Sequence, residues 1–260
     1  MKKSIFIIIY IIMMFICGQP EFVLATASLE VTVRPNQILM GALYNGANIS
    51  VMGNVPADSE VLIRLTGHLE DYKLKKKGRA MGVLWMNLGI VEIQKVPSLF
   101  LLYPSKAVND SLQAGRQSWQ DLGLGFEAVL KQANIVLDSE DKSALFEEFV
   151  KLEKKSGLYG TIKNTIHYKQ GKGGMKSFSC TLALPSGLPQ GVYKLDVFAI
   201  KDDAIAGYTS KEIEAKKVGM PAFITSFAFN HGTLYGVLAV LVAIIAGLVT
   251  GVIFKGEKAH

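Results

Sequence analysis

The chain has 260 residues, 50% of them hydrophobic, and a formal net charge of +6 at pH 7. This mildly basic balance is spread along the sequence, so it does not indicate nucleic-acid binding. Cys17 falls in a segment that we expect to be removed, which leaves Cys180 as the other cysteine and excludes a disulfide within the mature chain. Stability is therefore expected to come from a packed core.

The amino terminus has the pattern of a secretory signal peptide. Lys2 and Lys3 precede an apolar run from Ile5 to Ile16, and Ala25-Thr26-Ala27 offers small residues at a cleavage site. A proline-containing break ends the apolar run early, so cleavage after Ala27 is favoured over the alternative of an uncleaved anchor. Residues 1–27 are predicted to be a signal peptide.

The carboxyl terminus has the pattern of a membrane span. Residues 233–254 contain no charged side chain, and at about 1.5 Å per residue they form a helix of roughly 33 Å, long enough for the hydrocarbon core. Lys255 and Lys258 follow, which indicates a cytoplasmic tail. We expect a single-pass protein of the inner (cytoplasmic) membrane with its body on the periplasmic side.

Residues 28–105 read as short strands separated by turns. Leu29 to Val33 alternates apolar and polar side chains, and Val61 to Leu65 forms a second apolar run that ends at Gly67. Further strands are expected at Ile49–Met52, Tyr72–Lys77, Met81–Met86 and Pro97–Tyr103. Several short strands at this spacing predict a mainly β fold, an immunoglobulin-like antiparallel sandwich.

The middle of the chain changes period. Leu145, Phe146, Phe149 and Leu152 fall on one helical face, so residues 106–157 are predicted to be a helical insert. Strand patterns return over residues 158–218, as a second β unit or as the closing strands of the first. An aromatic-rich linker at residues 219–232 suits the bilayer interface and leads to the span.

A basic stretch supplies the first candidate surface. It consists of Lys75, Lys76, Lys77 and Arg79, followed by Trp85 and Asn87. Such a cluster attracts an inorganic anion, a phospholipid head group or an acidic partner. The alternative is a solvated strand face that protects an edge, with Trp85 as a core anchor.

The predicted span supplies the second candidate surface. Small residues recur every fourth position at Ala239, Ala243, Gly247 and Gly251, which places them on one helix face where another backbone can approach closely. The expected partner is a polytopic membrane protein or a second copy of the chain. The alternative is coincidence, because alanine and glycine are common in membrane helices.

No pattern points to catalysis. Catalytic-triad, phosphate-loop and dinucleotide motifs are missing from the sequence, and the histidines are isolated from one another. Cys180 lies in an apolar stripe between Phe178 and Leu182, so it is expected to be buried and inert. We therefore expect no enzyme activity, no cofactor and no metal site.

The order of several motifs resembles a known family. The matching stretches are Lys75 to Asn87, Val96-Pro97-Ser98, Leu188 to Tyr193, Lys217-Val218-Gly219, Leu234-Tyr235-Gly236 and Val252 to Lys255. They are similar to an uncharacterised family of predicted transmembrane proteins named for the alphaproteobacteria. The chain departs from that pattern at His68, where a proline is expected. The resemblance implies no activity or cofactor, and it gives an association with sulfite-exporter-type permeases as a lead.

Two functional hypotheses follow. The first is an extracytoplasmic accessory protein that packs on a polytopic membrane protein, such as an anion-exporting permease. The second is a self-sufficient ligand-binding or structural module of the envelope, for which the helix is a tether. A third reading, an enzyme site at the junction of sheet and helices, requires an acid, a base and a shifted pKa in a cleft.

Overall fold

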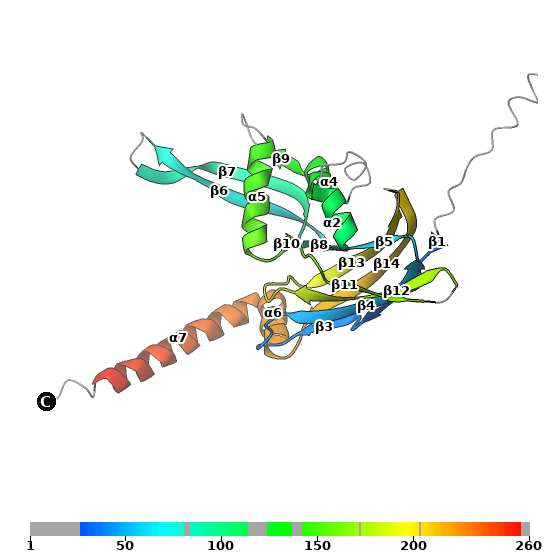
Figure 1. Cartoon of the computed structure of the whole chain (residues 1–260). Helices are drawn as coiled ribbons and strands as arrows, with labels where there is room; N and C mark the ends of the chain where they lie inside the picture. The colour runs from blue at the N-terminus through cyan, green and yellow to red at the C-terminus, as the bar shows by residue number, and fades with distance from the viewer. Residues whose placement is uncertain are drawn as a thin grey trace, which may run out of the picture.

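The structure, a computed structural model, describes residues 27–80, 84–113, 124–136, 142–171, 173–202 and 204–255 (Figure 1). The predicted signal peptide lies outside these residues up to position 26. The predicted fold class is confirmed: the body is β-rich with antiparallel sheets, helices interrupt it in the middle of the chain, and one apolar helix ends it.

The strands and helices have the following bounds. The strands are β1 (Ala27–Ser28), β2 (Val31–Arg34), β3 (Gln37–Met40), β4 (Ala47–Pro56), β5 (Glu60–Thr66), β6 (Leu69–Ala80), β7 (Leu84–Pro97), β8 (Phe100–Pro104), β9 (Asn134–Val136), β10 (Tyr159–Thr161), β11 (Ile166–Gln170), β12 (Met175–Leu184), β13 (Gly191–Lys201) and β14 (Ala204–Lys217). The helices are α2 (Lys106–Gln113), α4 (Phe126–Gln132), α5 (Lys142–Lys155), α6 (Met220–Asn230) and α7 (Gly232–Lys255).

The strands form three sheets. Sheet A has the order β1-β14-β13-β5-β8-β10, with β3 also paired to β14. Sheet B has the order β11-β12-β4-β2, and sheet C has the order β6-β7-β9. Strands after residue 158 pair directly with early strands, β12 with β4 and β13 with β5, so they close the sheets that the first half of the chain begins.

Sheets A and B pack face to face around the first hydrophobic core. On β5, Val61, Ile63 and Leu65 point into this core, and Phe178, Cys180 and Leu182 of β12 meet them from sheet B. The period-two alternation of each strand places these side chains on one face. The predicted sandwich is this pair of sheets.

The other face of sheet A is also covered. Leu62, Phe100, Leu102 and Phe198 point away from sheet B and join a second core with sheet C and the helices of the insert. The central strands of sheet A are therefore apolar on both sides, and Figure 1 shows α5 beside the long β6–β7 hairpin on this side. The body thus has three layers.

The structure refines the sequence reading in three places. The strand expected at Tyr72–Lys77 belongs to the longer β6, and residues 84–86 of the strand expected at Met81–Met86 belong to the longer β7, while residues 81–83 lie outside the described residues. Within the predicted linker, residues 220–230 form α6, with Pro221 in the first turn where a missing N–H costs no hydrogen bond. On α5, Leu152 is 47% exposed, while Glu153, one position further, is only 5% exposed.

One ion pair lies on the sheet A face that the insert covers. Asp196 of β13 is 1% exposed, and Arg64, directly opposite on β5, donates Nε and Nη2 to its Oδ2 at 3.2 and 2.8 Å. Tyr208 donates its hydroxyl to Oδ1 of Asp196 at 2.9 Å. A buried carboxylate is tolerated when its oxygens are satisfied in this way, so the triad fixes β5, β13 and β14 against one another.

Close packing at Gly53 gives a first prediction. A Cβ at this position of β4 would lie 2.7 Å from the carbonyl oxygen of Glu30 and 2.9 Å from the ring of Phe178. We expect Gly53→Ala to destabilise the body by about 1–3 kcal/mol through overpacking, measured as a lower thermal midpoint of the full chain in detergent.

The matched control is Gly89→Ala on β7, where a Cβ would have no neighbour within 4 Å. Its midpoint should be unchanged or slightly higher, because alanine restricts the unfolded chain more than glycine does. Equal midpoints for the two variants would contradict the packing described for the first core.

Candidate functional site

The predicted basic stretch lies on the β6–β7 hairpin. Lys75 is exposed on β6. The backbone register places Arg79 opposite Trp85 and Lys77 opposite Asn87, so the hairpin brings these predicted residues into neighbouring pairs. The side chains of Lys76, Lys77, Arg79, Trp85 and Asn87 lie outside the described part of the structure, and their proposed contacts stay predictions.

A groove runs between this hairpin and α5, and we name it the hairpin groove. It has a volume of about 610 Å³. Its lining consists of Leu74, Lys75, Val91, Ile93, Leu145, Glu148, Phe149, Lys151, Leu152 and Lys155. Most of these side chains are apolar, and they come from β6, β7 and one face of α5. The groove therefore joins one residue of the predicted basic stretch to an apolar floor.

The charges of the hairpin groove are predominantly positive. Its lining includes three lysines and one glutamate. That glutamate, Glu148, forms a 2.7 Å ion pair with Nζ of Lys151. Both partners of this pair are well exposed, so it contributes little to stability. An apolar floor with a lysine rim fits an amphipathic segment that carries acidic side chains.

Sequence reasoning missed most of this groove. The helical period places Leu145 and Phe149 on one helix face, but it does not single out the rim lysines of α5. The signal was present, because Lys151 and Lys155 are four residues apart and so share a helix face. The role of β6 and β7 as the opposite wall depends on tertiary packing.

The other side of α5 carries a second groove, the helix groove, between α5 and α4. It has a volume of about 450 Å³ and a floor that includes Phe126, Leu130, Phe146 and Val150. Nζ of Lys154 lies 4.8 Å from the ring centre of Phe126, a favourable cation–π geometry. Lys151 lines both grooves, so α5 forms a ridge between two apolar depressions.

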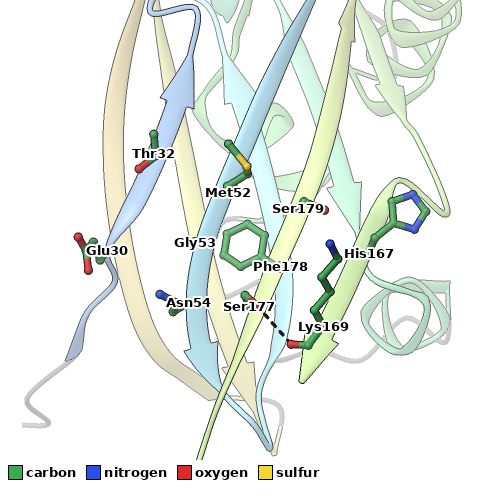
Figure 2. Close-up of a pocket in the computed structure, with 10 residues that line it drawn as sticks. All are labelled: Glu30, Thr32, Met52, Gly53, Asn54, His167, Lys169, Ser177, Phe178 and Ser179. Atoms are coloured by element: carbon green, nitrogen blue, oxygen red, sulfur yellow. Dashed lines mark hydrogen bonds between the residues drawn. The ribbon is translucent and has the colours of Figure 1, made fainter. Parts of the chain in front are cut away.

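The outer face of sheet B carries a polar groove of about 380 Å³ (Figure 2). Thr32, Met52, Ser179 and His167 lie in register across β2, β4, β12 and β11. Asn54, Ser177 and Lys169 form the next row in the same way. These hydroxyl, amide, imidazole and ammonium groups offer hydrogen bonds to a polar ligand, and an outward polar face is also the ordinary pattern of a solvated sheet.

Acidic and aromatic side chains meet where α5 crosses the start of β6. His68 immediately precedes β6, Glu70 and Tyr72 lie at its start, and Nε2 of His68 lies 2.7 Å from Oε1 of Glu70. Glu153 is buried beside them, and its Oε2 has no hydrogen-bond partner among the residues that the structure describes. Burial, and next the charge of Glu70, raises the pKa of Glu153 above its usual value.

The same burial acts on the neighbouring phenols. Desolvation, followed by the charges of Glu70 and Glu153, raises the pKa of Tyr72, and burial is also the main cause that raises the pKa of Tyr159. Tyr159 donates its hydroxyl to the carbonyl oxygen of Pro97 at 2.6 Å. Glu153 lies on the buried face of α5 with Phe146, Phe149 and Val150. The sequence does not predict its burial, because there it is one of several charged residues in this helix.

The remaining predicted positions are placed as follows. Cys180 is buried, as predicted, and desolvation raises the pKa of its thiol, which disfavours the reactive thiolate. Ala239, Ala243, Gly247 and Gly251 lie on α7, and each is exposed. Among the residues that the structure describes, no three His, Cys, Asp or Glu side chains come together as metal ligands.

Helix α7 matches the predicted span. The most apolar 18-residue stretch within Gly232–Phe254 has a mean hydropathy of 2.9, and none of that stretch is buried within the molecule. Within the described ranges it is the one helix long and apolar enough to cross a membrane. An apolar helix that is exposed all round is stable in lipid and would be costly in water.

The raised pKa of Glu153 makes the stability of the body depend on pH. The unfolded chain ionises this carboxyl near its usual value of 4.5, while the folded chain holds the proton to higher pH. The stability that the protonated Glu153 side chain contributes to the fold is therefore fully present below pH 4.5, and it is lost as the pH rises through the pKa of the folded chain. We expect Glu153→Gln to match the unsubstituted chain near pH 4 and to exceed its stability by about 1–3 kcal/mol at pH 8.

Thermal midpoints measured from pH 4 to 8 test this prediction. Glu147→Gln is the control, because Glu147 is exposed on the same helix. A constant difference between Glu153→Gln and the unsubstituted chain over the whole range would contradict the prediction.

The comparisons with known proteins agree with this architecture. The search of curated proteins finds no match to the chain. A sequence model of the family described as "Putative transmembrane protein (Alph_Pro_TM)" matches residues 28–256, which include the whole β body, the helical insert and the apolar helix. This is the family that the motif order resembles, and the chain belongs to it.

Proposed function

We propose that this membrane protein is an accessory subunit whose β body lies outside the cytoplasm and binds a segment of a polytopic membrane protein in the hairpin groove. The proposed membrane is the inner (cytoplasmic) membrane, with the body in the periplasm and the tail after Lys255 in the cytoplasm. The charge-free span followed by lysines supports this orientation.

The observation that carries the proposal is the hairpin groove. Its lining includes Leu152, which is 47% exposed, and the partly buried Leu74, so apolar surface stays open beside the second core. Exposed apolar surface rimmed by charge is typical of sites where proteins associate. Because the rim residues Lys75 and Lys155 are cationic, we propose an acidic amphipathic segment from an extracytoplasmic loop of the partner.

The second support is the surface of α7. Its small residues form a continuous strip along one face, and α7 packs on α6 only near its beginning, through residues such as Phe227 and Tyr235. Close approach of a second helix along Gly247 and Gly251 would supply the van der Waals contacts that hold membrane helices together. The association with a sulfite-exporter-type permease stays a prediction from the resemblance.

Substitution in the groove tests the first contact. We expect Leu152→Glu to reduce recovery of the partner with the full chain in mild detergent at least tenfold, because it places an acidic side chain where an acidic segment would bind. Val136→Glu is the control, since Val136 is 49% exposed on β9 and does not line the groove. Recovery is measured by quantitative mass spectrometry of a polytopic protein that crosslinks to the chain in intact cells.

Substitution in the span tests the second contact. Gly247→Leu fills the small-residue face, so we expect it to lower recovery of the same partner several-fold. Val249→Leu adds bulk to the other side of α7 and should leave recovery unchanged. A partner-free, monomeric chain in every mild detergent, or equal recovery with all four variants, would refute the accessory role.

A second candidate function has support from the outer face of sheet B. If the polar groove of Figure 2 binds a polar envelope ligand, the body acts alone and α7 is a tether. Replacing α7 by an unrelated span separates the two functions: retained function favours the tether, and lost function favours the partner.

A further inference from the structure

We propose that a second part of the body touches the membrane that α7 spans: the turn between β3 and β4, with Leu43 at its tip, inserts into the lipid interface together with α6. This contact goes beyond the accessory role, because it concerns lipid and does not require a partner protein. It would hold the body close to the bilayer and limit its rotation about α7.

The turn presents Leu43 outward on an ordered base. The backbone N–H of Tyr44 donates to the carbonyl of Gly41 at 3.1 Å, which closes the turn. Tyr44 packs against the first core, and its hydroxyl donates to the carbonyl of Pro185 at 3.4 Å. Because Tyr44 is anchored inward, the adjacent Leu43 is left 96% exposed. A leucine this exposed on a fixed turn is costly in water and favourable in lipid.

The turn begins beside the segment that leads into the membrane. Strand β3 pairs in parallel with the end of β14, so Met40 lies opposite Lys217. The N–H of Val218 donates to the carbonyl of Met40 at 3.0 Å, and α6 begins two residues later. Figure 1 shows the end of β3 next to α6, where the chain passes into α7. The turn and the start of α6 therefore occupy the same end of the sandwich.

The large exposed side chains at this end are mostly apolar or basic, and the smaller polar side chains of Asn45, Ser226 and Asn230 are exposed among them. Leu39, Leu43, Met220, Phe223, Ile224 and Phe229 are all exposed, and Phe229 reaches 86%. Lys216 and Lys217 are exposed at the end of β14; Lys216 pairs with Glu214 at 2.8 Å, and Lys217 adds a further positive charge. Leucine and phenylalanine with nearby lysines are the composition of surfaces that lie in the interface of anionic bilayers. The charge and the apolar area thus fit one occupant, the lipid surface.

Helix α6 sets the distance between the turn and the span. Its 11 residues cover about 16 Å, and His231 separates it from the start of α7 at Gly232. The rings of Phe223 and Phe227 stack at 5.9 Å, and Phe227 also meets Tyr235 of α7 at 6.4 Å, so aromatic side chains continue from one helix to the next. Aromatic side chains gather at the head-group level, which places α6 there and the adjoining turn with it.

A polarity-sensitive label tests the contact. The full chain carrying Leu43→Cys is labelled with a nitrobenzoxadiazole dye and reconstituted at about one copy per vesicle in phosphatidylcholine and phosphatidylglycerol. We expect blue-shifted emission and at least twofold quenching by a spin-labelled lipid. The unsubstituted chain, labelled in parallel, gives the signal of the native cysteines.

Ala57→Cys is the matched control. Ala57 is exposed in the turn at the far end of β4, about 33 Å along the strand from the proposed contact. Its label should emit as in water and resist the lipid quencher. Equal signals at the two positions would overturn the proposal, and so would a shift at position 43 that grows with the ratio of protein to lipid, because that result assigns the contact to a second copy.

Discussion

Burial of sheet A on both faces is the constraint on which the rest of the body depends. A sheet with two apolar faces is unstable unless both are covered, and its inward and outward side chains are fixed by a period of two. Sheet B covers one face around Phe178 and Leu182, and the insert with the β6–β7 hairpin covers the other around Phe100 and Phe198. The helical insert is therefore part of the folding unit and not an appendage.

This arrangement also explains where the open surfaces lie. Helix α5 must bury Phe146 and Phe149 against the second core, which leaves its flanks to form the two grooves beside the hairpin and α4. The same packing carries Glu153 into a site next to Glu70 and Tyr72, where its charge has poor solvation. Helix α5 thus lines the proposed binding groove and also carries the pH-sensitive Glu153 near its carboxyl end.

The proposed contacts lie at two levels relative to the bilayer. In this proposal, the small residues of α7 would face a neighbouring helix within the lipid, and the hairpin groove would bind a loop outside it. The turn at Leu43 and helix α6 would fix the height of the body above the membrane, since both adjoin the start of the span. A body held in this way presents the hairpin groove at a defined orientation, which reduces the entropic cost of binding a membrane partner.

The sequence by itself determined the features that depend on local pattern. The charge-free stretch at residues 233–254, the β-rich class, the helical insert and the buried position of Cys180 all follow from length, period and neighbouring residues. These signals suffice because lipid requires an unbroken apolar segment and because strands and helices differ in period.

Tertiary structure decided which faces meet. The run Val61 to Leu65 looks uniformly apolar, and only the pairing of β5 between β13 and β8 sorts Leu62 to one core and Ile63 to the other. Polarity alone suggests that Leu152 is buried and Glu153 is exposed, but the structure has the reverse. The packing of α5 beside the hairpin covers Glu153 and leaves Leu152 open. The grooves and the turn beside α6 are made by segments far apart in the chain, so no local pattern could specify them.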